Sequence, residues 1–448
     1  MNVTFLNGNP DRNQGGLDGY LFRLEQLFRE QGHAVTAITL RDLDLRGCNG
    51  CFDCWVRTPG ECIQPDEGWC VRQALIRSDF TLLAAPLLMG FPSALLKRTM
   101  DKLIPLIHPY FAVAHGEAHH LKRYERYPRL GLLVEREASS DAADLAITAD
   151  IFSRAALNMQ TSLEFASDTG RPLEDLARAM TAPLDPRACV AFAEGLGPTR
   201  GVQVAPPSRL TVFNGSPRGK KGNTPLLLGH FLRGFETHPG RSSQIYHLNR
   251  LHDGEVFQQA FAEAECVWLG FPLYVDAMPG QVKTFIESLE PFVGNPGNPP
   301  IGFLVQSGFP EAVHSRHVER YLEKLAARLG SPYLGTIVRG GVEGIQSQPE
   351  KASARLYQTM YLLGQTFGAT GRLDPTLLRS LIPFERFRWF QQPVLHLLAR
   401  LPMLHYYWDS QLKQNGVYEQ RFARPYEEMG QGSIDNRDLR TENRNIFP

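Results

Sequence analysis

Four cysteines fall close together in the chain, spaced as Cys48-x2-Cys51-x2-Cys54-x7-Cys62. Thiolates at this short spacing can reach separate irons of a cubane cluster, and a turn at residues 58–60 (Thr-Pro-Gly) brings back the fourth ligand. A tetrahedral zinc site would use the same four ligands, although zinc modules typically space them as two distant pairs. Cysteines that bind no metal are a third interpretation. The spacing favours an iron–sulfur cluster over zinc.

A glycine-rich basic loop, residues 214–224 (Asn-Gly-Ser-Pro-Arg-Gly-Lys-Lys-Gly-Asn-Thr), joins an apolar run to a helical pattern. Its glycines let the backbone approach an anion, and its hydroxyls, basic side chains and helix start supply hydrogen bonds and charge. It matches neither a P-loop nor a GxGxxG fingerprint, and a basic surface turn is the alternative. The loop predicts a phosphate site formed by Ser216, Arg218, Gly222, Asn223 and Thr224.

Two further loops follow predicted strands in the same part of the chain. Tyr274 can pack on a flat ring, backbone groups of residues 275–278 can bond the ring's polar edge, and the next loop faces the same crevice. The predicted ring-binding residues are Pro272, Leu273, Tyr274, Val275, Asp276, Ala277, Met278, Ser307, Gly308 and Phe309. No acid, base or nucleophile is predicted to be catalytic, and histidines such as His314 and His317 are interpreted as surface residues of a helix.

These loops need a scaffold, and the hydrophobic pattern predicts one in which apolar strands alternate with amphipathic helices. We expect strands at 2–6, 34–40, 79–85, 130–134, 210–213, 244–248, 266–270, 301–306 and 334–338. We expect helices at 93–104, 139–157, 224–235, 279–289 and 313–329. Near-continuous apolar strands alternating with helices indicate α/β architecture, with doubly wound parallel sheets covered on both faces.

The pattern occurs twice. Residues 5–10 (Phe-Leu-Asn-Gly-Asn-Pro) match 212–217 (Val-Phe-Asn-Gly-Ser-Pro) at an offset of 207, and Pro86, Lys97 and Pro105 match Pro272, Lys283 and Pro291 at an offset of 186. The 21 extra residues of the first copy (207 − 186 = 21) fall in the interval that contains the cysteines. We therefore expect a tandem duplication.

Domains are predicted at 1–195 and 208–370, followed by a C-terminal extension at 371–448. The first copy has Asn9, Asp11 and Leu17 where the second has Ser216, Arg218 and Thr224, so we expect its degenerate phosphate loop to hold no phosphate. The extension is aromatic, with Phe384, Phe387, Trp389, Phe390, Tyr406, Tyr407 and Trp408. We expect it to pack against the second domain or a partner subunit; capping the crevice or touching a membrane surface are the alternatives.

Composition excludes several classes of function. The 47 basic and 47 acidic residues cancel, so no electrostatic footprint for nucleic acid is visible. No signal peptide and no apolar run of about 20 residues, the length of a membrane-spanning helix, is found. We expect a cytoplasmic protein without a transmembrane segment.

Taken together, the three motifs resemble the NADPH-dependent FMN reductase family, especially its iron–sulfur flavoprotein branch. The matching segments are 215–218 with 222–224, 272–274, and the four cysteines followed by Asp66. The resemblance implies flavodoxin-like domains, FMN on the second, NAD(P)H as donor, and a [4Fe-4S] cluster on the first. Unlike the family, this chain divides the motifs between two copies.

The function implied is an NAD(P)H-dependent FMN oxidoreductase or electron-transfer flavoprotein, acting on a small redox substrate or an electron-carrier protein. If the two copies mimic a dimer, flavin and cluster would face each other and exchange electrons. A simple flavin or quinone reductase with structural cysteines, zinc-bound or free, is one alternative. A non-enzymatic binding module is another, and a homo-oligomer remains open.

Overall fold

The computed structural model describes residues 1–448 apart from 13–15, 188, 389, 392–401 and 429–448. The first sheet contains β1 (Asn2–Asn7), β2 (Ala34–Thr39), β3 (Phe80–Leu88), β7 (Arg129–Glu135) and β8 (Leu163–Asp168), with β4 (Phe91–Pro92) folded back onto β3. The second contains β9 (Arg209–Asn214), β10 (Ser242–His247), β11 (Val267–Pro272), β12 (Ile301–Gln306) and β13 (Tyr333–Arg339). A separate hairpin pairs β5 (Ile107–Ala114) with β6 (Glu117–Lys122).

The strand orders are β2-β1-β3-β7-β8 and β10-β9-β11-β12-β13, and all pairs along both paths are parallel. Counted within each sheet, both orders read 2-1-3-4-5, which is the flavodoxin-like arrangement. The predicted fold class is therefore confirmed. We call β1 to α6 the N-terminal unit and β9 to α12 the C-terminal unit.

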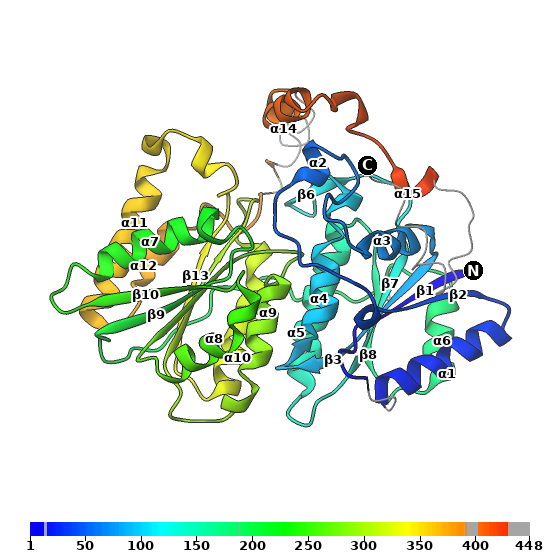
Figure 1. Cartoon of the computed structure of the whole chain (residues 1–448), viewed down its shortest axis with the longest axis horizontal. Coiled ribbons are helices and arrows are strands. Elements are labelled where there is room, and N and C mark those ends of the chain that lie inside the picture. The colour runs from blue at the N-terminus through cyan, green and yellow to red at the C-terminus, as the bar shows by residue number, and fades with distance from the viewer. Residues whose placement is uncertain (13–15, 188, 389, 392–401, 429–448) are drawn as a thin grey trace.

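Helices cover both faces of each sheet (Figure 1). Those of the N-terminal unit are α1 (Gly16–Glu30), α2 (Asp53–Val56), α3 (Gly68–Arg77), α4 (Ala94–Asp101), α5 (Ala142–Asn158) and α6 (Leu173–Thr181). Those of the C-terminal unit are α7 (Asn223–Phe235), α8 (Gly254–Ala262), α9 (Gly280–Ser288), α10 (Val313–Leu329), α11 (Glu350–Thr370) and α12 (Pro375–Ser380). The chain continues with α14 (Pro402–Gln414) and α15 (Pro425–Glu428).

The buried apolar residues form layers that follow from the helix patterns. In α1, Leu17, Leu21, Leu24 and Phe28 recur at helical spacing and are buried against the outer face of the first sheet, beside α6. Helices α7 and α11 cover the outer face of the second sheet. The inner faces share one continuous core, to which α3, α4 and α5 contribute from one unit and α8, α9 and α10 from the other. The two units are thus packed together through apolar surface.

Where α4 packs against α9, the contacts repeat with two-fold pseudosymmetry. Lys97 Nζ donates to the carbonyl of Tyr274 (3.0 Å), and Lys283 Nζ donates to the carbonyl of Leu88 (2.9 Å). The two lysines are 186 positions apart in the sequence (283 − 97), and so are the two residues whose carbonyls accept these hydrogen bonds (274 − 88).

The carboxylates at this contact repeat in the same way. Asp101 accepts the N–H of Gly280 and Glu287 accepts that of Ala94, both at 2.7 Å. Each of these residues is again 186 positions from its counterpart (287 − 101 and 280 − 94). The α4–α9 contact thus has approximate two-fold symmetry.

The C-terminal extension lies on both units. Its first part, which includes Leu373 and Leu381, belongs to the core of the C-terminal unit, as expected, whereas α14 and α15 lie on the N-terminal unit. Helix α14 contacts α2, and α15 contacts α3, where Tyr426 accepts a hydrogen bond from the buried Arg72. Trp389, included among the aromatic residues of the extension, lies outside the described residues. Of the helices described, none is long and apolar enough to cross a membrane.

Candidate functional site

One cavity of about 940 Å³ lies between the two units. Its size is at the upper end of the roughly 300–1,000 Å³ typical of sites for small molecules and cofactors. The N-terminal unit contributes the cysteine loop, here defined as residues 48–62, and the C-terminal unit contributes the loops at the carboxyl ends of β9, β11 and β12. Eleven predicted ligand-site residues line it, namely Ser216, Arg218, Asn223, Pro272, Leu273, Tyr274, Val275, Asp276, Ser307, Gly308 and Phe309.

Four other predicted site residues lie behind this wall. Ala277 and Met278 are fully buried in the shared core, so they support the loop from below. Thr224 is also buried, and its Oγ1 accepts a hydrogen bond from the Gln306 amide (3.3 Å). Gly222 directly precedes α7, where an added Cβ would lie 2.0 Å from Ser216 Oγ, so only a glycine fits beside this hydroxyl.

The loop after β11 makes a tight turn over residues 274–277. Tyr274 and Ala277 exchange both backbone hydrogen bonds, at 2.8 and 3.0 Å, and Val275 and Asp276 have φ of 46° and 55°. A left-handed conformation is unfavourable for a β-branched residue such as valine. Strain of this kind persists where surrounding contacts enforce it, and it is concentrated at ligand sites.

Two predicted ligand-site side chains touch the cysteine loop directly. Arg218 Nε donates to the carbonyl of Gly50 (2.7 Å), and its guanidinium lies 4.7 Å from the centre of the Phe52 ring. The Tyr274 hydroxyl reaches the same glycine, because a Cβ built on Gly50 would lie 2.2 Å from it. Burial raises the pKa of Tyr274 well above its usual value. The loops after β9 and β11 of one unit therefore meet the cysteine loop of the other.

All four cysteines line this cavity. Burial raises the pKa of the Cys48 thiol to about 12, and it raises that of Cys54, with the thiols of Cys48, Cys62 and Cys51 adding to the effect. The four sulfurs are thus near enough to influence one another. Over the described part of the chain, however, no three or more His, Cys, Asp or Glu side chains are grouped so that they could hold a metal ion.

The cysteine loop is fixed at its base and covered by the extension. Asp66 accepts the N–H of Arg46 (2.9 Å) and pairs with the buried Lys102, which holds the two ends of the loop together. Trp55 stacks on Phe52 with ring centres 4.9 Å apart, and Trp408 of α14 packs edge-on against both rings. The expected alternative role of the extension, capping the crevice, agrees with the position of Trp408, which lines the cavity.

In the N-terminal unit, two carboxylates lie at positions that correspond to this crevice. In the sheet register, Glu135 of β7 lies opposite Pro86 of β3, just as Gln306 of β12 lies opposite Pro272 of β11. The Glu135 carboxylate accepts a hydrogen bond from the backbone N–H of Leu17 at the start of α1. Burial raises the pKa of Glu135. Its negative charge, when present, would repel a phosphate at this helix start.

Glu137 occupies the second half of that crevice. Its carboxylate accepts the backbone N–H groups of Met89 (3.3 Å) and Gly90 (2.9 Å). These two residues have φ of 53° and 74°, and at the offset of 186 they correspond to Val275 and Asp276. In the C-terminal unit, Gly308 (308 − 171 = 137) leaves the equivalent place free of a side chain. The N-terminal unit therefore has carboxylates at two positions where the C-terminal unit has Gln306 and Gly308.

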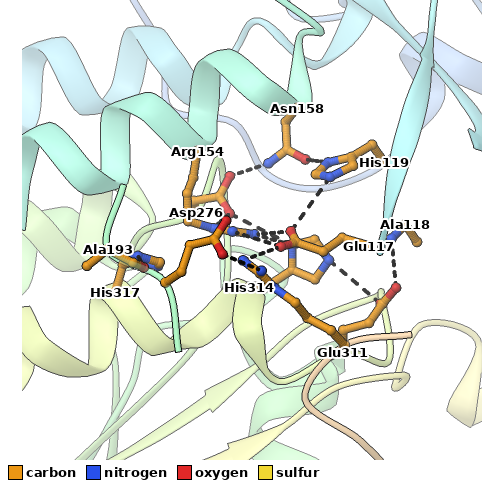
Figure 2. A network of polar contacts seen from close by, with 12 residues as sticks. Glu117, Ala118, His119, Arg154, Asn158, Ala193, Asp276, Glu311, His314 and His317 are labelled. Atoms are coloured by element: carbon orange, nitrogen blue, oxygen red, sulfur yellow. Dashed lines mark hydrogen bonds and ion pairs between the residues drawn. The ribbon is translucent and has the colours of Figure 1, made fainter. Parts of the chain in front are cut away.

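A buried polar cluster lies beside the 274–277 turn (Figure 2). Arg154 of α5 contacts Asp276 (Nε to Oδ1, 3.3 Å) and Glu117 (2.7 Å), and it lies 3.1 Å from His314 Nδ1. Asn158 links Asp276 to His119, whose Nδ1 lies 2.6 Å from the amide oxygen. His314 and His317 are each 2% exposed, so their interpretation as surface residues was wrong.

The charges of this cluster determine its protonation. Burial alone would raise the pKa of both Glu117 and Asp276. Hydrogen bonds and charge from Arg154 outweigh burial at Glu117, so its pKa is lowered. His314 and Arg154 together outweigh burial at Asp276, so its pKa is lowered as well. The pKa of His314 is raised because Asp276 and Glu311 outweigh burial and Arg154. Burial lowers the pKa of His119, and burial with Arg154 lowers that of His317 to about 4.

Comparison with curated proteins supports the resemblance predicted from the motifs. Over 105 residues the chain is 27% identical to an iron–sulfur flavoprotein of Archaeoglobus fulgidus, a match that covers 23% of this chain and 48% of that protein. The chain thus spans about half the length of this curated relative. No family model matches the chain.

Solved structures to which part of the chain is similar include the azoreductase AzrA, at 16% identity and a TM-score of 0.30 over 36% of this chain and 100% of that one. A second is an FMN-dependent NADH-azoreductase of Bacillus anthracis in complex with FMN, at 12% identity and a TM-score of 0.29 over 36% and 99%.

Proposed function

We propose that this chain is an FMN-dependent oxidoreductase that takes its electrons from a nicotinamide. The observation that carries the proposal is the single cavity in which the basic loop after β9, the strained turn after β11 and the loop after β12 converge. The sequence resemblance of part of the chain to an iron–sulfur flavoprotein supports it. When bound, FMN supplies hydride or single-electron transfer, and the protein supplies position and surroundings.

The residues fit such a ligand in charge and shape. Ser216, Arg218, Asn223 and Thr224, with Gly222 giving access, would hold the phosphate at the start of α7. The segments 272–278 and 307–309 would hold the ring, with Tyr274 beside it and Gly308 leaving room. The cavity has mostly apolar walls, which suit a flat aromatic ligand.

We expect the purified protein to be yellow or brown and to contain one FMN per chain rather than two. The reason is that Glu135 and Glu137 already accept backbone N–H groups of the N-terminal unit at the positions that correspond to the flavin site. The concentration of FMN, obtained from the absorbance of the cofactor released by denaturation, is divided by the protein concentration to give the number of FMN per chain. Addition of NADPH or NADH without oxygen should bleach the flavin band. Colourless protein that does not oxidise either nicotinamide would favour a non-enzymatic binding module.

We also propose that the cysteine loop holds a [4Fe-4S] cluster that exchanges electrons with the flavin. Four cysteines on the wall of the same cavity favour this over an isolated structural site. Since the described thiols are not grouped as a metal site, binding requires the loop to draw them together. Gly50 and Gly60, both with positive φ, are points at which its backbone can adjust.

Protein purified without oxygen is expected to contain about four iron and four sulfide per chain, the content of one cubane cluster. Replacing the exposed Cys51 by Ser should lower the iron content and leave the FMN content unchanged, because Cys51 is one of the proposed ligands and Ser is a poor one. Metal analysis and absorbance on the same samples measure both. FMN with zinc, or FMN without metal, would leave a flavin or quinone reductase with structural cysteines and rule out the electron relay.

A further inference from the structure

One side of the cavity is aromatic and has no part in the function as proposed so far. The loops after β9, β11 and β12 account for the phosphate and ring positions, whereas the opposite side comes from the cysteine loop, the hairpin β5–β6 and the C-terminal extension. Figure 1 shows α14 beside α2, and α14 also contacts β5. We call the rings that these elements bring to the cavity the aromatic wall: Phe52, Trp55, His120, Phe387 and Trp408.

The inner part of the aromatic wall is fixed and reaches the ring position. Trp55 Nε1 donates to the carbonyls of Ile107 (2.9 Å) and Ile104 (3.2 Å), which holds the indole in one orientation. The ring centre of His120 lies 5.0 Å from that of Trp55 and 4.9 Å from that of Phe309. Phe309 belongs to the loop that would hold the flavin ring, so a ligand on the wall would lie next to that ring.

The C-terminal extension supplies the outer part of the aromatic wall. Trp408 packs edge-on against Phe52 and Trp55, with ring centres 5.4 and 5.2 Å apart. The backbone N–H of Phe387 donates to the carbonyl of Gly116 in the hairpin (2.8 Å). Phe387 and Trp408 are only half-buried, although they line the cavity, so apolar ring surface is left for a ligand to cover. Removing such surface from water favours binding, and rings held in place lose little freedom in the process.

The charges around the cavity favour a neutral ligand. The aspartate, glutamate, lysine and arginine side chains among the described lining residues are all paired, as Asp101–Lys97, Lys102–Asp66, Arg218–Glu343 and Asp276–Arg154. Burial lowers the pKa of His120 to about 4, so this ring is neutral at pH 7. A charged ligand on the aromatic wall would give up its hydration without gaining an unpaired partner.

We propose that the aromatic wall binds the electron acceptor, a neutral quinone of one or two fused rings, beside the flavin ring position. This inference rests on the proposed function, which supplies the electrons. In one turnover the quinone takes up the hydride equivalent of one nicotinamide and one proton from solvent, and it leaves as the hydroquinone. Trp408 and Phe387 of the extension are then specificity-determining residues, because their rings stack against the acceptor.

Binding can be measured without turnover. Calorimetric titration of the oxidised protein with menadione, a neutral quinone of two fused rings, is expected to show one site per chain when no nicotinamide is present. The sulfonated analogue of the same ring system should bind roughly 10-fold more weakly, because its charge must be desolvated without a partner. The fluorescence of free FMN should not rise during the titration, since the two ligands occupy different sides of the cavity.

Trp408→Ala tests the contribution of the extension. The KM for menadione, with NADPH as donor, should rise about 10-fold, which corresponds to about 1.4 kcal/mol. The rate with ferricyanide, which takes up single electrons and no ring contacts, should stay within about twofold, as should the FMN content. Trp408→Phe keeps a ring and should restore most of the affinity. Tyr406→Ala is the matched control: this aromatic residue of α14 is 72% exposed and is not among the lining residues, so all three quantities should be unchanged.

The outcomes separate this inference from the proposed function. Release of FMN by menadione, equal binding of the sulfonated analogue, or an unchanged KM for menadione in Trp408→Ala would each overturn the acceptor site. Wild-type protein that binds no menadione would overturn it whatever the variants do. Wild-type protein that binds menadione but no flavin would instead overturn the proposed function.

Discussion

Replacing Lys97 by Met is expected to lower the free energy of unfolding by about 3–5 kcal/mol, the usual cost of removing one partner of a buried ion pair. Lys97 and Asp101 are each 3% exposed and pair within α4, and Lys97 also holds the Tyr274 carbonyl of the opposite unit. Without the lysine, Asp101 keeps the Gly280 N–H and the more distant charge of Arg98 but loses its paired counter-charge. Urea-induced unfolding, followed by circular dichroism, measures the loss.

The pseudosymmetry of the interface provides a matched control. Lys283→Met removes the corresponding lysine, but its partner Glu287 is 22% exposed and can be solvated by water. We therefore expect a smaller loss than in Lys97→Met, although the contact removed at the Leu88 carbonyl is equivalent. In Lys97→Met/Asp101→Leu, most of the lost stability should return, since no charge is left buried. Equal losses in both single variants would show that the buried carboxylate is not the cause.

The loss in Lys97→Met should depend on pH. Burial raises the pKa of Asp101 above its usual value even with Lys97 present, and removing the lysine raises it further. A carboxyl with a raised pKa in the folded state stabilises the fold below its unfolded pKa, and this contribution disappears as pH rises through the folded value. The deficit of Lys97→Met should therefore be largest at neutral and alkaline pH and shrink as the solution is acidified. A deficit that grows on acidification would contradict this explanation.

The second large effect is expected in Gly222→Ala, which should weaken FMN binding about 10- to 100-fold. The backbone of Gly222, with φ −78° and ψ 164°, accepts an alanine. The added Cβ, however, would lie 2.0 Å from Ser216 Oγ and 2.8 Å from Ser216 Cβ, so this residue must move into the proposed phosphate space. Overpacking of this kind costs about 1–3 kcal/mol, which corresponds to the expected change in affinity.

Gly229→Ala is the control for this variant. It makes the same substitution inside α7, at a position where an added Cβ meets nothing within 4 Å. It should leave the affinity for FMN unchanged and stabilise the helix by about 0.5–1 kcal/mol. Quenching of FMN fluorescence, titrated with flavin-free protein, measures both affinities. Wild-type affinity in Gly222→Ala would show that the phosphate is not held beside Ser216.

Periodicity and repeated motifs predicted the fold class and nine of the ten parallel strands that the structure describes. The inner strands bury both faces, so their apolar runs identify them, whereas the half-buried edge strand β8 was missed. The matches at offsets 207 and 186 correspond to equivalent positions in the two units. Gly8 and Gly215 donate to Ala84 and Gly270, respectively, both at 2.7 Å. The hairpin β5–β6 was missed because its alternation is interrupted by polar residues whose partners lie elsewhere in the chain.

The parts of the site that were not predicted depend on contacts between the two units. Helix α10 has the pattern of a one-sided amphipathic helix, but it packs on its own sheet and also against α5, which buries His314 and His317. The partner of His314, Arg154, is 160 residues away in sequence. Similarly, a phosphate loop alone does not indicate that Arg218 reaches Gly50 of the other unit. Local pattern cannot reveal such pairs, because the two residues of each pair lie about 160 positions or more apart in the sequence.

The paired lysine contacts between α4 and α9 also determine how the protein responds to dilution. Two separate subunits joined by the same contacts would dissociate as their abundance fell, and the cavity between them would be lost. Here one chain joins both sides, so each meets the other at an effective concentration on the order of millimolar, whatever the number of copies in the cell. A site assembled from both units is therefore complete in every folded molecule, even in a cell that makes very few of them.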